Sequence, residues 1–275
     1  MNIISSDTLY FTFETSSSWN AEFHMHNFCE IYLLLKGEVD FFIDDSRFRI
    51  SPGTLIPIND YELHKAILVS PGEYQRCYIH IPKRYFQRFS SELTDVSACF
   101  YNRRPGRENI FRLTPEQSGF IQRCIRRMME LRDSSPFGCD LLTESCLVQV
   151  LVLVNSLFYS GQAANACTGR QYSPAVASAI AFLDAHLLSE ISLEQIAKAC
   201  CLEKHYLCRL FKKETGVTPF RFLLLKRLSL SKQLLSQGYS VTEACFRTGF
   251  RNYNNFITTF RNQVGCTPGQ YQREL

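Results

Sequence analysis

Hydrophobic and polar positions change their spacing along the chain, and these changes separate parts with different secondary structure. Between about residues 22 and 81, short runs rich in Phe, Ile, Leu, Val and Tyr alternate with turn sequences such as Lys36-Gly37 and Ser51-Pro-Gly53. Short strands separated by such turns are typical of an antiparallel sandwich or barrel. The sequence therefore predicts a β domain over residues 1–110.

The next part of the chain has helical periodicity. Thr114-Pro-Glu-Gln117 matches a capping box with Pro at the first helical position, and an apolar stripe follows from Phe120 to Leu131. A second helix is expected over residues 139–159, with Leu142 among its inward residues. We interpret residues 111–160 as an antiparallel helical pair, packed either on the barrel or against a second subunit.

Residues 191–273 contain one pattern twice, about 49 residues apart. Each copy opens with a Ser-based capping box, at Ser192 and Ser240, and closes with Gly-x-Thr-Pro. Each copy therefore predicts a helix-turn-helix unit, joined to the other by a helix over residues 220–235. That helix, of roughly 17 residues and about 26 Å, is comparable with the roughly 34 Å between successive major-groove faces. The second helix of each unit has an apolar stripe, predicted to be Tyr206, Leu207, Leu210 and Phe211 in the first copy and Tyr253, Phe256 and Phe260 in the second.

The opposite faces of these two second helices carry cations, amides and hydroxyls, which suit phosphates and base edges. We expect DNA contacts from Lys204, His205, Cys208, Arg209 and Lys212 in the first copy, and from Asn254, Asn255, Thr258, Thr259 and Arg261 in the second. The net charge of this part of the chain also favours DNA binding, because residues 166–275 hold 14 Lys and Arg against 7 Asp and Glu. A basic segment gains affinity for DNA by neutralising phosphates.

These stretches resemble the AraC/XylS family of transcriptional regulators. The resemblance rests on residues 206–216, Lys226-Arg-Leu, residues 248–256 and Gly265-Cys-Thr-Pro268, and it spans about the last hundred residues. It implies a cytoplasmic bacterial regulator, an activator, that binds promoter DNA and contacts RNA polymerase. Glu203, Thr258 and Gln272 depart from the family pattern, which suggests a weaker phosphate grip by the second reading helix.

The β region contains a second pattern, His24-Met-His26, Glu30, Gly37, Pro52-Gly53 and His64, which resembles that of cupins. Residues two apart on a strand point to one side, so His24 and His26 should face the barrel interior with Glu30 and His64. We expect an effector pocket lined by His24, His26, Glu30, Tyr32, His64 and His80. Three imidazoles and a carboxylate also suit Zn, Mn, Fe or Ni. The Pro57-to-His64 spacing is longer than in metal-binding cupins, and the resemblance to the regulators implies an organic effector, so no cofactor is expected.

The twelve cysteines form no Cys-x-x-Cys, so we expect reduced thiols in a cytoplasm. The first residues lack a basic segment, so no secretory signal is expected. The apolar stretch over residues 146–159 is shorter than the roughly 20 residues that cross a bilayer, so we expect a buried helix and no membrane partner.

The predicted fold class is a multidomain α+β protein. It has an N-terminal antiparallel cupin-like barrel for an effector (1–110), a helical pair that mediates homodimerisation or only caps the barrel (111–160), a linker (161–173) and an all-α double helix-turn-helix domain (174–275). The alternative is a metal-dependent cupin enzyme with an appended DNA-binding domain. Apart from His24, His26, Glu30 and His64, the sequence has no pattern that points to catalysis, so we expect no enzyme.

Overall fold

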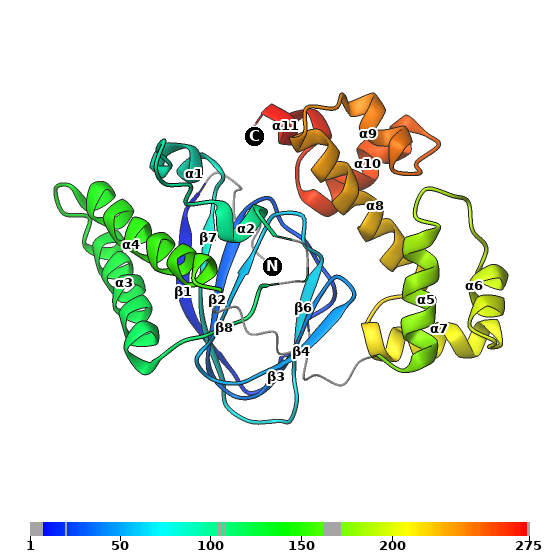
Figure 1. Cartoon of the computed structure of the whole chain (residues 1–275), viewed down its shortest axis with the longest axis horizontal. Coiled ribbons are helices and arrows are strands. Elements are labelled where there is room, and N and C mark those ends of the chain that lie inside the picture. Colours follow the sequence, from blue (N-terminus) through cyan, green and yellow to red (C-terminus); the bar gives the residue numbers. More distant parts are fainter. Residues whose placement is uncertain (1–7, 20, 104–105, 107, 162–171, 274–275) are drawn as a thin grey trace.

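The computed structural model describes residues 8–19, 21–103, 106, 108–161 and 172–273. Figure 1 shows a β barrel-like body with a helical pair on one side and an all-helical part on the other. The N-terminal sheets and the C-terminal helical region agree with the predicted fold class. The expected linker lies mostly in residues 162–171, outside the described residues.

Two antiparallel sheets form the N-terminal body. The five-stranded sheet has the order β1 (Tyr10–Ser16), β7 (Tyr74–Ile81), β2 (Cys29–Lys36), β5 (Thr54–Ile58) and β8 (Phe111–Arg112), and the three-stranded sheet has the order β4 (Ser46–Ile50), β3 (Val39–Ile43) and β6 (His64–Leu68). Strands β1 and β8 lie outside the region in which the sequence pattern predicts strands. In β8, Phe111 pairs with Leu55, so the β structure continues into the segment assigned to the helical pair.

Apolar side chains fill both faces of the larger sheet. Between the two sheets, Tyr32, Phe41 and Ile56 belong to one fully buried cluster. The other face of the larger sheet packs against helices α1 (Arg84–Phe89), α2 (Ala98–Tyr101), α3 (Pro115–Ser134) and α4 (Cys139–Tyr159). Helices α3 and α4 begin where the sequence predicts, and Thr114 and Gln117 form the expected capping box. The short helices α1 and α2 were not predicted.

Helix α4 is long and apolar enough to cross a membrane, by length and composition alone. A core helix of a globular domain passes the same test. Here one face, with Leu147, Val150 and Val154, packs into the apolar cluster under the sheet. The prediction that Leu142 is buried is wrong, because this residue is exposed together with Leu141 and Val152. The exposed side of α4 is therefore partly apolar.

The C-terminal part contains helices α5 (Pro174–Ala185), α6 (Leu193–Ala199), α7 (Lys204–Thr215), α8 (Pro219–Ser236), α9 (Val241–Arg247), α10 (Tyr253–Val264) and α11 (Pro268–Arg273). Both predicted capping boxes form, at Ser192 and Ser240. Helix α8 is the predicted connector and runs between the two helical groups in Figure 1. Two aromatic residues expected in the core, Tyr206 and Tyr253, are exposed instead, because they lie in the first turn of α7 and α10, beyond the packed part of each helix.

The two parts of the chain share an apolar core. Phe23, Met25, Phe42 and Leu63 of the barrel belong to the same buried cluster as the helices of the C-terminal part. The Phe23 and Phe222 rings meet edge to face at 5.5 Å between centroids. Tyr172, just after the undescribed segment, lies against Phe42. The barrel and the helical part therefore pack against one another in this structure, an interface that the sequence pattern does not predict.

Candidate functional site

Helix α7 presents the first predicted DNA-reading face. Leu207 and Phe211 are buried, while the cationic side chains on the opposite side are exposed. Four of the five expected residues, Lys204, His205, Arg209 and Lys212, are exposed, and Cys208 is half-buried. Glu203 stands at the N-cap of α7, where the family usually has a small polar residue. It caps the helix, since its carboxylate accepts a hydrogen bond from the Tyr206 amide at 2.9 Å. A free cationic face thus remains along this helix.

Helix α10 has the same construction with different chemistry. Phe256, Phe260 and Val264 face inward, and Asn252 caps the helix through the amide of Asn255. The outer face consists of the exposed residues Asn254, Asn255, Thr258 and Arg261, with Thr259 half-buried. The Thr259 hydroxyl donates to the Asn255 side chain at 3.2 Å, which orients that amide. The two faces together offer charges on α7 and amide and hydroxyl groups on α10.

The histidines predicted for the barrel form a cluster around Glu30, which we call the histidine cluster: His24, His26, Glu30, His64 and His80. One carboxylate oxygen of Glu30 lies 3.2 Å from His26 Nε2, 3.9 Å from His64 Nε2 and 3.6 Å from His80 Nε2. Glu30 and His80 are opposite one another on β2 and β7, which explains their proximity. The side chains of these four residues are at most 12% exposed.

Backbone carbonyls fix the imidazole rings of three of these histidines. The Nδ1 atom of His26 lies 2.7 Å from the Phe28 carbonyl oxygen, and those of His24 and His64 lie 2.9 Å from the carbonyls of Glu22 and Glu62. A carbonyl oxygen only accepts, so Nδ1 carries the proton in each ring. The Nε2 atoms of His26 and His64 therefore hold lone pairs directed to the region around Glu30.

Burial keeps these rings neutral near pH 7. It lowers the pKa of His26 to about 4, and it lowers the pKa of His24 and His64 as well, since a charged ring is poorly solvated there. Burial alone would raise the pKa of Glu30, but the neighbouring His26 and His80 outweigh it and hold that pKa well below the usual range. Glu30 is thus an ionised carboxylate beside the neutral rings of His24, His26 and His64.

The predicted pocket residues are not equivalent in the structure. His24 packs against His64, with 4.4 Å between ring centroids, but only His26, Glu30 and His64 bring candidate ligand atoms within 4.8 Å of one another. The proposal of His24 as a fourth metal ligand is therefore not supported. Tyr32 is fully buried between the sheets, where its hydroxyl lies 3.1 Å from that of Tyr74. Phe28 was not predicted, yet its ring stacks on both His26 and His80 at 4.1 Å.

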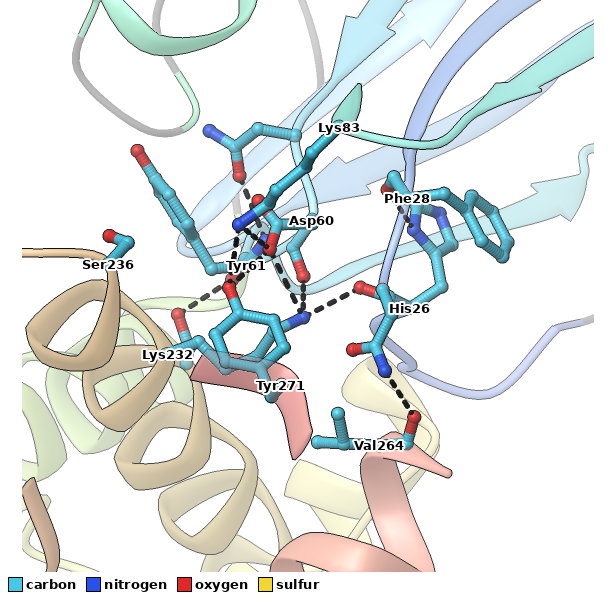
Figure 2. Close-up of polar contacts among 12 residues, drawn as sticks. His26, Phe28, Asp60, Tyr61, Lys83, Lys232, Ser236, Val264 and Tyr271 are labelled. Atoms are coloured by element: carbon cyan, nitrogen blue, oxygen red, sulfur yellow. Dashed lines mark hydrogen bonds and ion pairs between the residues drawn. The ribbon is translucent and has the colours of Figure 1, made fainter. Parts of the chain in front are cut away.

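A buried polar junction joins the barrel to the C-terminal helices (Figure 2). Its centre is Asp60, which is fully buried and ion-paired with Lys83 at 2.9 Å and Lys232 at 3.7 Å, and which accepts a hydrogen bond from the Tyr271 hydroxyl. Lys232, on α8, also donates to the backbone carbonyls of Asp60 and His26, the latter at 2.7 Å.

Electrostatics at this Asp60 junction favour the docked state. Burial alone would raise the pKa of Asp60, but the ammonium groups of Lys83 and Lys232 lower it below its usual range. Burial lowers the pKa of Lys232 to about 8 in spite of Asp60. Both groups are thus charged near pH 7, and removing Asp60 would leave the buried Lys232 without its counter-ion, whereas removing Lys232 would leave Asp60 with Lys83 alone. Removing one partner of a buried pair typically costs about 3–5 kcal/mol.

The barrel also contacts the carboxyl-terminal end of each reading helix. Lys65 donates to the Glu214 carbonyl in the last turn of α7 at 3.3 Å, and Asn27 donates to the Val264 carbonyl at the end of α10 at 3.0 Å. These carbonyls have no partner within their own helices, so the barrel supplies the missing donors. Asn27 and Lys65 each follow a histidine of the cluster, Asn27 in the bend before β2 and Lys65 on β6, where neighbouring residues point to opposite sides.

Sequence reasoning missed this junction. Asp60 and Lys232 are 172 residues apart, and no local pattern pairs them. The available sign was that Asp60 lies between Pro57 and His64, the stretch that is longer than in metal-binding cupins. Lys226 and Ser229, which also face the barrel, look like ordinary solvent-facing positions of a connecting helix.

Fold and site together define a class of protein: a transcription regulator with an N-terminal ligand-binding domain and a helix-turn-helix DNA-binding domain. Residues 9–151 match the AraC-like ligand binding domain, and residues 196–274 match a helix-turn-helix domain. The chain belongs to the AraC family.

Similar proteins include the HTH-type transcriptional activator RhaS of Klebsiella pneumoniae (strain 342), 25% identical over 89% of this chain and 85% of that protein. The uncharacterised HTH-type transcriptional regulator YdeC of Bacillus subtilis is 23% identical over 91% and 85%. Among solved structures, ToxT of Vibrio cholerae O395 gives a TM-score of 0.43 at 11% identity, covering 98% of this chain and 99% of that one. The C-terminal domain of AraT from Geobacillus stearothermophilus gives 0.37 at 28% identity, covering 38% and 89%.

Proposed function

We propose that this protein is an activator whose affinity for promoter DNA is set by a small-molecule effector bound at the histidine cluster. In this proposal Lys204, His205, Cys208, Arg209 and Lys212 of α7 and Asn254, Asn255, Thr258, Thr259 and Arg261 of α10 contact DNA. The protein acts in the cytoplasm and recruits RNA polymerase. It catalyses no reaction, in line with relatives that are transcription regulators.

The observation that carries the proposal is the double role of the segments around His26 and His64. The side chain of His26 joins the cluster, while its carbonyl accepts from Lys232 of α8 and the next residue, Asn27, holds the end of α10. His64 likewise joins the cluster, and Lys65 holds the end of α7. A ligand that moves the two histidines therefore moves the contacts that set the relative position of α7 and α10.

Coupling of this kind requires the effector to bind two domain arrangements with different affinity. The docked arrangement seen here is one of them. A typical coupling free energy of about 1–3 kcal/mol corresponds to roughly a 5–150-fold change in DNA affinity.

We further propose that the protein is a homodimer joined through α3 and α4. The exposed side of α4 carries Leu141, Val152 and Tyr159, and Phe137 in the preceding turn is fully exposed. Apolar patches of this kind mark protein–protein contacts. Sedimentation equilibrium of the whole chain tests this point, since a Val152→Glu variant should then be monomeric.

The experiment that tests the proposed function is a footprint of the purified full-length protein on the DNA that flanks its own gene. Arg209→Ala and Arg261→Ala each remove one cation from a reading face and should weaken binding roughly tenfold. Arg132→Ala, an exposed cation on α3, is the matched control and should bind like the wild type. Losses within twofold for both reading-face variants would contradict the proposed DNA surface.

A further inference from the structure

We propose that His26, Glu30 and His64 bind one divalent first-row transition-metal ion, and that this ion is the ligand that the sensor detects. The inference deepens the proposed function and rests on it. It specifies the chemical class of the effector, which neither the family nor the relatives determine for this chain. Four of the six histidines in the sequence lie in the cluster.

The first argument is the kind of atoms that converge. Since the Nδ1 protons of His26 and His64 are donated to backbone carbonyls, both Nε2 atoms present lone pairs. The third group, Glu30, is a carboxylate that only accepts. His26 Nε2 and Glu30 Oε2 thus lie 3.2 Å apart with no proton between them when the ring is neutral. A cation between these atoms turns a repulsive contact into a favourable one.

The backbone contacts that direct these lone pairs are themselves typical of metal sites. Metal-binding histidines almost always donate their second ring nitrogen to a carbonyl or carboxylate, which fixes the tautomer and the ring orientation. The carbonyls of Phe28 and Glu62 have this role here. Phe28 adds a second restraint, because its ring stacks on His26 with an interplanar angle of 13°. The rings are therefore held in place without a bound ligand.

The second argument is size. The three ligand atoms all lie within 4.8 Å of one another. Ligand atoms around a tetrahedral zinc ion, bound at about 2.0–2.2 Å, are roughly 3.3 Å apart. Two of the three spacings, 3.2 Å and 3.9 Å to Glu30, are near that value, and the remaining one, within 4.8 Å, would contract by up to about 1.5 Å around an ion.

The ligand types indicate which ions fit. Two imidazoles with one carboxylate suit zinc, iron, cobalt, nickel or copper, whereas magnesium and calcium prefer oxygen ligands. His80 offers a further ligand atom, with its Nε2 3.6 Å from the same Glu30 oxygen. Its Nδ1 is buried and without a hydrogen-bond partner in the described part of the chain. Unlike the other rings, His80 is not fixed by any described backbone carbonyl, and its packing against Phe28 and Tyr78 holds its orientation.

The test is metal binding by the full-length protein. After treatment with a chelator, the protein is titrated with Co²⁺, followed by its visible absorption, and the Co²⁺ is then displaced with Zn²⁺ in competition with a coloured chelator. The expected result is one equivalent per chain. Glu30→Gln, which keeps the shape of the side chain, and His64→Gln should each weaken binding at least about tenfold. His186→Gln, at the end of α5, is the matched control and should bind within twofold of the wild type.

Less than about one-tenth of an equivalent in the wild type, or equal binding by all variants, would overturn the metal site. Circular dichroism of each metal-free variant separates lost binding from lost folding. The second arm repeats the footprint with and without Zn²⁺, and an unchanged footprint would overturn the sensing role even if the ion binds. If the metal fails to bind while Arg209→Ala still weakens DNA binding, the inference falls and the proposed function stands.

Discussion

Asp44 shows how a single buried carboxyl can make stability depend on pH. It lies in the turn between β3 and β4, at a positive φ of 50°, and contacts Lys226 of α8 at 3.6 Å. Burial raises the pKa of Asp44 to about 7, because Lys226 offsets only part of the lost solvation and Glu62, Asp45 and Asp184 oppose ionisation. The folded protein therefore holds a proton that the unfolded chain has already lost.

The prediction is that the contribution of Asp44 to the free energy of unfolding falls as pH rises from about 4 through 7, since the folded state binds this extra proton over that window. Asp44→Asn keeps the shape, tolerates a positive φ and cannot ionise. It should equal the wild type near pH 4 and exceed it at pH 8 by up to roughly 4 kcal/mol. Urea unfolding at both pH values measures this difference. Exposed Asp45→Asn is the control, and a flat difference for Asp44→Asn would refute the assignment.

Individual site residues differ in how far the sequence reveals them. His24, His26, Glu30 and His64 stand out because their spacing fits one face of a barrel strand, and the structure does bring three of them together. Asp60 and Lys232 do not stand out, since their pairing exists only after the two halves of the chain dock. The sequence pattern does not single out Phe28, because an aromatic residue in a β segment is normally interpreted as a residue of the hydrophobic core.

At the scale of elements, two glycines with the same backbone conformation form a natural comparison. Gly238, after α8, and Gly249, between α9 and α10, have φ of 88° and 82°. A Cβ at Gly238 would meet nothing within 4 Å, whereas at Gly249 it would lie 3.0 Å from the Leu187 carbonyl oxygen and from Arg227 Nε. Arg227 donates to that same carbonyl at 2.8 Å, which keeps both atoms in place.

Gly238→Ala should therefore lower stability by about 1–2 kcal/mol, the usual cost of a left-handed residue with a Cβ. Gly249→Ala has the same conformational cost and a steric clash in addition, so its loss should be larger by at least about 1 kcal/mol. Thermal unfolding of both variants measures the difference. Equal losses would show that the second helix-turn-helix unit adjusts its turn freely.

Helix boundaries were predicted well because their signals are local. Capping boxes at Thr114, Ser192 and Ser240 require only four neighbouring residues, and all three form. Short elements carry weaker signals, and α1, α2, β1 and β8 depend on packing against the larger sheet. Tyr206 and Tyr253 were assigned to the core by periodicity alone, which does not show where along a helix its packing partner ends.

For the whole molecule, the main prediction concerns the docking of the two parts through the Asp60 junction. Lys232→Met and Asp60→Asn each remove one partner of the buried pair. If the parts dock in solution, the double variant should lose less stability than the sum of the single variants, by at least about 1 kcal/mol. Chemical unfolding of the four proteins gives this coupling, and a value below about 0.5 kcal/mol would mean that the contact is not made.

A control for that cycle pairs Lys232→Met with Arg126→Ala, an exposed residue on α3, which lies on the other side of the β body from α8 in Figure 1. These two substitutions should be additive within about 0.5 kcal/mol. Small-angle scattering of Lys232→Met gives an independent reading, because loss of docking increases the radius of gyration.

The adjacency of His26 to Asn27 and of His64 to Lys65 has an evolutionary consequence. In the proposed function, ligand preference and transmission to the helices are encoded by adjacent codons, so point mutations can alter either property alone. Loss or gain of one residue on β6 would exchange the sides to which His64 and Lys65 point, and one beside His26 would shift Asn27 from the end of α10, so either change would abolish both properties. Divergence at these two places should therefore proceed by replacement, with lineage-specific insertions confined to the turns that flank them.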